Sequence, residues 1–254
     1  MTNFTREEIN VRGVRTVVYS VGLGEPLVYF HGAGTVTGFD FIEAWADRFR
    51  VIAPFHPGFG ESGDNPSFTD IHDYVMHYLD LFDLMKIDAI RLVGVSMGGY
   101  LAAKFASEHG HRIRKLVLVC PYGLDVPEHP ALDLINTPGQ QIPGLLVSNF
   151  ETIKPYLPDH PGAEFIEVRQ REAMTFARLF REHPTDPKFS RHLDRIRMPT
   201  LVVWGNEDKI IPPAHADVWK ARIPQAEVRM VEGAGHIVYL DRPDTLNTIG
   251  RFWG

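Results

Sequence analysis

The chain has 254 residues, of which 44% are hydrophobic and 23% charged, so its composition is close to the globular average. This composition excludes disorder over most of the chain, and the length allows one large domain or two small ones. The 26 basic and 32 acidic residues leave a formal net charge of −6. A mildly acidic surface repels phosphate backbones, so we expect no nucleic-acid partner.

Cys120 is the only cysteine, which excludes an internal disulfide and a cysteine-rich metal cluster. The N-terminal residues lack the basic start and apolar run of a secretory signal. No uninterrupted apolar stretch approaches the ~20 residues needed to cross a bilayer. These features predict a cytoplasmic protein without a membrane partner.

Short apolar runs predict the strands. The first, residues 14–20, alternates between apolar and polar residues after Gly13, so residues 11–20 suit an antiparallel edge hairpin. The later runs are continuously apolar, as expected for parallel strands that helices cover on both faces. They span residues 26–30, 50–54, 90–95, 115–120, 200–204 and 226–231.

Helical patterns fall between these runs. Residues 68–85 carry apolar side chains spaced by three and four, with Ser67 or Thr69 as the candidate N-cap. Strands that alternate with helices predict an α/β fold with a mostly parallel sheet flanked by helices on both faces. The other predicted helices span residues 97–107, 162–182, 213–222 and 243–252.

Residues 122–195 interrupt this alternation, because they contain many prolines and no convincing strand pattern. With the hairpin counted as two strands, the segment falls between the sixth and seventh strands. We therefore predict a helical cap, or lid, over one edge of the sheet. The expected division is a core domain of residues 1–122 and 196–254, with residues 123–195 as the inserted cap.

A G-x-S-x-G pattern, Gly94 to Gly98, joins the strand at 90–95 to the helix at 97–107. In this context the turn is strained and exposes the Ser96 hydroxyl above the sheet as a nucleophile. Side chains at Gly94 or Gly98 would collide with the turn, and the N-terminus of the helix offers free N–H groups to an oxyanion. The simpler alternative is a serine that caps the helix.

A serine nucleophile needs a base, and the base needs an orienting carboxylate. Asp208 follows the strand at 200–204, and His236 follows the strand at 226–231. Both therefore lie beyond strand C-termini, at the same sheet edge as Ser96. The chain order Ser96, Asp208, His236 is the order expected for this class of site.

With these motifs the sequence resembles the α/β-hydrolase-fold family over nearly the whole chain outside the cap. The resemblance implies an α/β-hydrolase fold and a serine hydrolase with Ser96, Asp208 and His236 as its triad. It also implies an oxyanion hole formed by the backbone N–H groups of Ala33 and Met97. The matching segments are His31-Gly32-Ala33-Gly34, Pro57-Gly58-Phe59-Gly60-Glu61-Ser62, the elbow, Trp204-Gly205-Asn206-Glu207-Asp208 and Gly233-Ala234-Gly235-His236.

Three positions leave alternatives open. Glu207 neighbours Asp208, but the family spacing after Trp204-Gly205 selects Asp208 as the acid. Some family branches place the acid after the strand at 115–120, where Asp125 is the candidate. His56 stands where relatives commonly have Asp, and a structural contact in the turn is favoured over a chemical role.

The family implies hydrolysis through an acyl-enzyme, and the leading hypothesis is a carboxylic-ester hydrolase for a small or medium, largely apolar acyl substrate. The first alternative is a carbon–carbon bond hydrolase of vinylogous diketones from ring cleavage. Those relatives share Pro-Gly-Phe-Gly and Ser-Met-Gly-Gly, but they usually carry a Trp shortly after the catalytic His, where this chain has Ile237-Val238-Tyr239-Leu240. They also carry a cap Arg, for which Arg169, Arg171 and Arg178 are candidates. A non-enzymatic ligand-binding protein with the same fold is the alternative from another class.

The sequence predicts a small-molecule substrate and no cofactor or metal. A G-x-G-x-x-G match begins at Gly58, but Asp64-Asn65-Pro66 intervenes before a helix can start, which argues against dinucleotide binding. The pairs His109/His111 and His72/His77 lack further ligands at metal-site spacing and are expected to be solvated.

Overall fold

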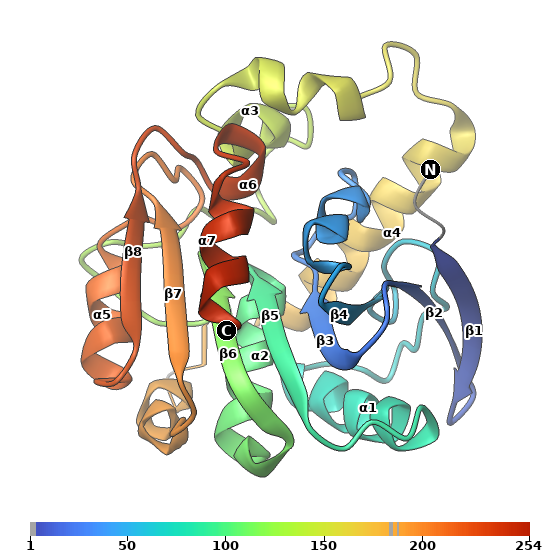
Figure 1. The fold of residues 1–254 in the computed structure, drawn as a ribbon. Helices are drawn as coiled ribbons and strands as arrows, with labels where there is room; N and C mark the ends of the chain where they lie inside the picture. The colour runs from blue at the N-terminus through green and yellow to red at the C-terminus, as the bar shows by residue number, and fades with distance from the viewer. Residues whose placement is uncertain (1–3, 183–184, 187) are drawn as a thin grey trace.

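The structure is a computed structural model that describes residues 4–182, 185–186 and 188–254. Its centre is an eight-stranded sheet with the order β1-β2-β4-β3-β5-β6-β7-β8 (Figure 1). The strands are β1 (Thr5–Val11), β2 (Val14–Val21), β3 (Glu25–Phe30), β4 (Phe49–Pro54), β5 (Ile90–Val95), β6 (Ile113–Val119), β7 (Thr200–Gly205) and β8 (Glu227–Val231).

Seven α-helices and five 3₁₀ turns accompany the described strands. The α-helices are α1 (Ile71–Leu84), α2 (Met97–Glu108), α3 (Ile142–Leu146), α4 (Ala163–Phe180), α5 (His215–Arg222), α6 (Val238–Asp241) and α7 (Thr245–Phe252). The 3₁₀ turns are η1 (Asp40–Trp45), η2 (Gly110–Arg112), η3 (Phe150–Thr152), η4 (Lys154–Tyr156) and η5 (Phe189–Arg195).

The strands from β3 to β8 pair in parallel, whereas β1 and β2 pair antiparallel at one edge. The predicted hairpin is therefore confirmed, and it turns at Arg12 and Gly13, which both have positive φ. The sequence prediction missed most of β1. Five of its seven side chains are exposed or nearly so, which leaves little apolar pattern to recognise.

Helices lie on both faces of the sheet, as predicted. On one face α2 packs on β5 and β6 beside α1 and η5, and on the other face α7 lies beside η1 (Figure 1). Between β6 and β7, the described residues form helices and loops and contribute no strand. This segment includes α3 and α4, so the helical insertion falls between the sixth and seventh strands, where the sequence placed it.

Helix α1 begins later than predicted, and neither Ser67 nor Thr69 is its cap. The N-cap is Asp70, whose carboxylate accepts the backbone N–H of Asp73. The Asp73 carboxylate in turn accepts the N–H of Asp70, at 3.3 Å, which completes a capping box. These two reciprocal hydrogen bonds fix the start of α1 at Asp70 instead of at another polar residue nearby.

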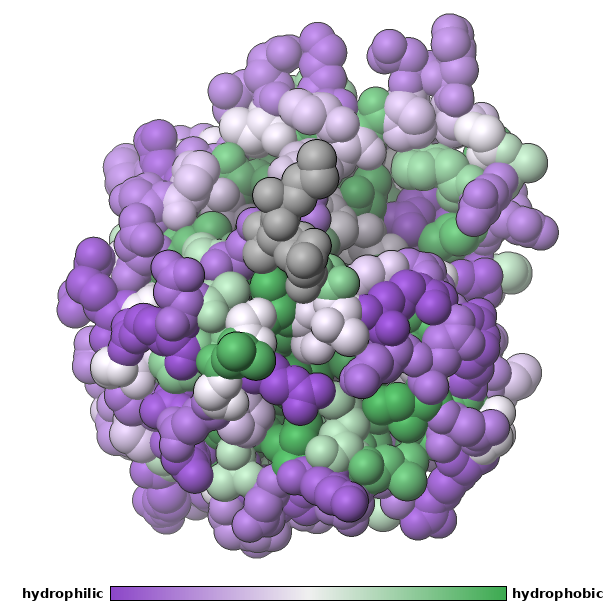
Figure 2. Space-filling model, turned by 45° about the vertical axis from the view of Figure 1, so that its right-hand side comes forward, coloured by the Kyte–Doolittle hydropathy of each residue, from purple (hydrophilic) through white to green (hydrophobic). Residues whose placement is uncertain are grey.

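The surface is mainly hydrophilic on the face that Figure 2 shows, with hydrophobic residues scattered among polar ones. Isolated apolar side chains of this kind are normal on a globular surface. No helix among the described residues is long and apolar enough to cross a membrane.

The expectation that His77 is solvated is wrong. Its ring is 3% exposed, and its Nε2 lies 3.1 Å from the Thr16 hydroxyl, beneath the β1–β2 hairpin. Burial, which disfavours the charged imidazolium, lowers the pKa of His77 to about 4. A histidine in an unfolded chain titrates near 6.5. As the pH falls, the unfolded chain therefore takes up this proton before the folded protein does.

We expect the free energy of unfolding to decline as the pH falls from about 6.5 toward 4. Each buried neutral histidine contributes at most about 1.4 kcal/mol per pH unit over its window. His77→Gln should make this decline shallower, as measured by urea unfolding at pH 7, 6 and 5. The same change at the exposed His160 should leave the slope unaltered. Equal slopes in wild type and His77→Gln would contradict the assignment.

Candidate active site

Ser96 occupies a strained turn between β5 and α2. Its φ of 55° and ψ of −119° are unusual for a residue with a side chain. A Cβ atom at Gly94 would lie 2.2 Å from the carbonyl oxygen of Gly98, and one at Gly98 would lie 2.3 Å from that of His31. The predicted collision at both glycines is thus confirmed. The Ser96 side chain makes no capping hydrogen bond to α2, which removes the simpler interpretation.

Asp208 and His236 meet through a direct hydrogen bond between the loops that follow β7 and β8. The His236 Nδ1–H donates to Asp208 Oδ2 at 2.8 Å, and both residues are buried. The backbone holds the two loops together, because the N–H of Glu207 donates to the carbonyl of Ala234 at 2.9 Å. With Nδ1 bonded to the carboxylate, Nε2 is left free to act as a base.

The Asp208 carboxylate is stabilised in its charged form. Burial opposes ionisation, but the charge and hydrogen bond of His236, with the backbone N–H groups of Ile211 and Ile210, outweigh it and lower the pKa of Asp208. The two N–H groups reach Oδ1 at 3.0 and 2.8 Å. The alternative acids, Glu207 and Asp125, have exposed side chains and do not share this position.

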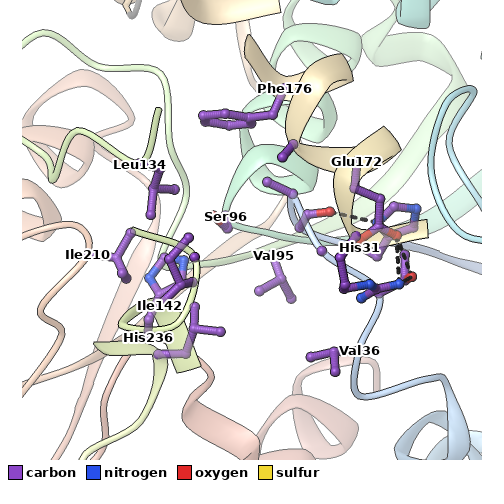
Figure 3. A pocket seen from close by; sticks show the side chains of 18 of the residues that line it. His31, Val36, Val95, Ser96, Leu134, Ile142, Glu172, Phe176, Ile210 and His236 are labelled. Carbon is purple, nitrogen blue, oxygen red and sulfur yellow. Dashed lines mark hydrogen bonds and ion pairs between the residues drawn. The ribbon is translucent and has the colours of Figure 1, made fainter. Parts of the chain in front are cut away.

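Ser96 and His236 line the same cavity beneath the cap (Figure 3). They form no hydrogen bond with each other among the described residues. The cavity has a volume of about 1060 Å³, large enough for a medium-sized organic molecule. Core and cap both contribute to its largely apolar wall, with Val36, Val95 and Ile210 from the core and Leu134, Ile142 and Phe176 from the cap.

Cys120 lies behind the pair. Its Sγ, a carboxylate oxygen of Asp208 and a ring nitrogen of His236 all fall within 4.8 Å of one another. The thiol is fully buried, and burial, followed by the Asp208 charge, raises the pKa of Cys120 well above its ordinary value. A protonated thiol without access to the cavity is a poor nucleophile. Asp208 Oδ1 accepts the N–H groups of Ile210 and Ile211, and Oδ2 accepts that of His236. The carboxylate in this cluster is therefore engaged in hydrogen bonds.

The loop after β3 runs beside Ser96. A Cβ at Gly32 would lie 3.3 Å from the Ser96 Cβ, and Ala33 lines the cavity. Met97 is the first residue of α2, and the first N–H groups of a helix have no intrahelical acceptor. Of the two residues predicted to supply oxyanion donors, Ala33 therefore neighbours the glycine that approaches Ser96, and Met97 directly follows Ser96 in the chain.

His56 holds the loop after β3 in place through two hydrogen bonds with His31. Its Nε2–H donates to the His31 carbonyl at 2.9 Å, and its backbone N–H donates to His31 Nε2 at 2.9 Å. The Tyr78 hydroxyl completes the set as donor to His56 Nδ1. Burial lowers the pKa of His31 to about 3 and that of His56 well below its ordinary value. The neutral rings thus act as fixed hydrogen-bonding groups, in line with the structural role favoured from the sequence.

The cap arginines are paired with protein groups. Arg169 Nη2 donates to Glu172 at 3.1 Å and to the Thr35 hydroxyl at 2.9 Å, and burial lowers the pKa of Arg169. Arg178 forms a two-pronged pair with Asp64, at 2.6 and 3.0 Å. Arg171 donates to the carbonyl of Gly60. Arg169 and Arg178 therefore have carboxylate partners, whereas the partner of Arg171 is a carbonyl. The Nε atoms of Arg169 and Arg171 are buried without a partner among the described residues.

Sequence analysis missed Glu172, which is 2% exposed. Its Oε1 accepts the Thr35 hydroxyl at 2.6 Å and the Gly60 N–H at 3.0 Å, so it joins α4 to two core loops. A signal was present, because Glu172 lies midway between Val168 and Phe176 at spacings of four on the apolar face of the helix. A charged residue in that stripe indicates a buried polar contact.

Comparisons with known proteins agree with this geometry. The family model described as "Alpha/beta hydrolase family" matches residues 27–249. Lipase 1 of Psychrobacter immobilis is 30% identical over 237 residues, 87% of this chain and 74% of the lipase. The 2-hydroxy-6-oxo-2,4-heptadienoate hydrolase of Pseudomonas putida is 27% identical over 95% of this chain and 94% of its own length.

Among solved structures, a meta-cleavage product hydrolase from Pseudomonas fluorescens IP01 superposes with a TM-score of 0.83. It is 20% identical and the match covers 97% of both chains, so the likeness shows a shared fold. Together with the family match, which spans most of the sequence, these findings establish that the chain belongs to the alpha/beta hydrolase family.

Proposed function

We propose that the protein is a serine hydrolase that acts through an acyl-enzyme on a small-molecule ester. Ser96 is the nucleophile, His236 the general base and Asp208 the orienting acid. The observation that carries the proposal is the buried Asp208–His236 hydrogen bond of 2.8 Å at a cavity that also contains the strained Ser96. Residues 1–122 and 196–254 serve as the core domain and residues 123–195 as the cap.

The reaction begins when His236 Nε2 takes the Ser96 proton and Ser96 Oγ attacks the ester carbonyl carbon. Asp208 holds the proton on Nδ1 and stabilises the imidazolium that forms. His236 then gives its proton to the leaving alcohol, and the acyl group stays on Ser96. Water enters with His236 again as base, and a second tetrahedral intermediate releases the carboxylic acid.

The negative charge on the tetrahedral oxygen needs preorganised donors. The backbone N–H groups of Ala33 and Met97 are proposed for this role, each worth about 3 kcal/mol in such sites. Ala33 lines the cavity on the loop that His56 holds in place. Its neighbour Gly32 approaches Ser96, and Met97 directly follows Ser96 at the start of α2.

We infer that the substrate carries no charge in its acyl part. The cavity wall is mainly apolar, and three cap cations line it. Arg169 and Arg178 are paired with Glu172 and Asp64, whereas Arg181 is exposed to solvent and not buried with the apolar wall. A buried carboxylate on the substrate would lack a free cation to offset its loss of hydration. A neutral acyl chain needs none.

The apolar cavity wall with its paired cations also favours ester hydrolysis over carbon–carbon bond hydrolysis. The Pseudomonas putida relative is named for a dienoate, which is a carboxylate anion, whereas Lipase 1 is named for lipid substrates. Carbon–carbon hydrolysis remains the second candidate because of that relative, which spans nearly the whole chain. A ligand-binding protein without activity is the third, and the absence of turnover would distinguish it.

Replacement of Ser96 by Ala should abolish hydrolysis of short 4-nitrophenyl esters. Loss of the nucleophile of a serine triad costs on the order of a millionfold in the best-studied case, so the residual rate should approach background. The rate should also fall in acid, because only neutral imidazole accepts the serine proton. Steady-state assays of purified wild type and variant measure both effects.

Cys120→Ser provides the matched control, because it alters the other nucleophilic side chain near His236 without touching Ser96. It should retain most of the activity. A fluorophosphonate should label wild type and Cys120→Ser but not Ser96→Ala, as read by mass spectrometry. Wild-type rates in Ser96→Ala would refute the triad, and inactivity of only the cysteine variant would transfer the nucleophile to Cys120.

A matched pair of esters tests the preference for neutral acyl chains. We expect 4-nitrophenyl hexanoate to have a kcat/KM at least about tenfold above that of the 4-nitrophenyl monoester of adipic acid, equivalent to about 1.4 kcal/mol. Glu172→Gln should narrow this ratio, because it leaves Arg169 without its carboxylate partner. The ratio is the readout, since it cancels a general loss of activity.

Glu167→Gln is the control for this prediction, because it makes the same charge change at an exposed position of α4. It should leave the ratio at the wild-type value. A wild-type preference for the adipate monoester, or rapid cleavage of a ring-cleavage dienoate with poor turnover of both esters, would favour the carbon–carbon hydrolase instead.

A further inference from the structure

One carboxylate, that of Asp241 at the end of α6, joins the loop of the catalytic histidine to the cap. Its Oδ2 accepts the backbone N–H of Gly235 and that of Ser148, both at 2.8 Å. Its Oδ1 accepts the N–H of Asn149 at 3.2 Å and lies 3.2 Å from the Thr152 hydroxyl, which also donates to the carbonyl of Asn149 at 2.7 Å. Gly235 directly precedes His236, whereas the other three partners belong to the cap.

The contact between these two segments is close on both sides of His236. The N–H of Ile237 donates to the carbonyl of Leu146 at 2.8 Å, and the Ser148 hydroxyl donates to the carbonyl of Gly233 at 2.9 Å. A Cβ at Gly235 would lie 2.7 Å from the carbonyl carbon of Val147. The backbone around the base is therefore packed directly against cap residues 146–149.

We propose that Asp241 is a positioning residue that couples the seating of cap residues 146–152 to the orientation of His236. The proposal rests on the proposed function, because it assigns a role in that chemistry. Asp241 does not line the cavity and does not reach Ser96, so it acts only through the backbone of the His236 loop.

The chemistry of the four partners requires a carboxylate. Three of the four partners of Asp241 are backbone N–H groups, which can only donate a hydrogen. An asparagine offers one acceptor oxygen and one NH₂ donor, so it would place a donor against an N–H on one side. In one orientation the asparagine loses the acceptor shared by Gly235 and Ser148, and in the other its NH₂ faces the N–H of Asn149. The joint between the cap and the His236 loop is therefore weakened in both orientations.

The consequence is that the cap contributes to the geometry of the base as well as to the wall of the cavity. When cap residues 146–152 move away from the core, Ile237 loses its hydrogen bond to Leu146 and Gly235 loses its packing against Val147. Both contacts border His236. A misplacement of about 1 Å can cost about a hundredfold in rate, so a modest shift of this loop is enough to affect catalysis.

Asp241→Asn tests the positioning role in the full-length protein. We expect kcat for 4-nitrophenyl hexanoate to fall about tenfold or more while KM changes less than about threefold, because the cavity wall is intact. The rate of fluorophosphonate labelling of Ser96 should fall in parallel, whereas the fraction labelled at completion should match wild type. A role in stability alone would lower that fraction and leave the labelling rate unchanged.

Asp244→Asn is the matched control, since it removes the same charge three residues away at an exposed position. It should behave as wild type in both assays. Activity of Asp241→Asn within twofold of wild type, or an equal loss in Asp244→Asn, would overturn the proposal.

Thr152→Val tests the coupling from the cap side and remains informative if Asp241→Asn does not fold. It removes a hydroxyl that touches Asp241 but keeps the carboxylate that binds Gly235. Hydrogen exchange measured by mass spectrometry should be faster than in wild type for peptides that contain residues 235–237, although Thr152 does not contact them. Unchanged exchange there would refute the coupling. This readout needs no activity, so it separates failure of the proposal from failure of the proposed function.

Discussion

The active centre depends on one backbone constraint, the positive φ of Ser96 at the end of β5. A conformation of this kind costs about 1–3 kcal/mol and persists only when its surroundings impose it. Here close packing imposes it, because the carbonyl of Phe30 and the helix turn at Gly98 leave no room for side chains. The parallel sheet then brings the loops after β7 and β8 to the same edge, so Asp208 and His236 can pair beside the serine.

The sheet brings the loops of the site close together, and polar side chains then hold these loops in place. His56 and Tyr78 hold the loop after β3 from the core side, and Glu172 reaches the same loop from the cap through Thr35. Asp241 performs the corresponding task for the His236 loop. Both ring nitrogens of His56 and both carboxylate oxygens of the half-buried Asp241 have hydrogen-bond partners, which is the condition under which a polar network rigidifies a site instead of weakening it.

Local patterns were sufficient to predict the parallel strands, the elbow and the chain order of the triad candidates, because each of these is written in a few consecutive residues. They failed where a partner lies far away in the sequence. Glu172 and Thr35 are 137 residues apart, and Asp241 and Ser148 are 93 apart. His77 was misjudged for the same reason, since the hairpin that buries it precedes it by 61 residues. Periodicity within a helix can indicate a buried polar residue, as at Glu172, but it does not identify the distant partner.

The same distinction between short sequence motifs and contacts of distant residues applies to function. The proposed reaction depends on the motifs, whereas its substrate specificity would depend on the contacts between cap and core. In the reaction that we propose, the elbow and the Asp208–His236 pair, which lie at the edge of the sheet, would suit any acyl substrate whose carbonyl can reach Ser96. Selection among substrates would then fall to the cap, whose apolar and basic residues form the other wall of the cavity. Because Glu172 binds both Arg169 and the loop beside Ser96, the charge that a substrate meets and the geometry of the oxyanion loop depend on the same carboxylate. Substitutions of Glu172 or Arg169 should therefore alter specificity and rate together, whereas substitutions in the sheet should alter rate or stability alone.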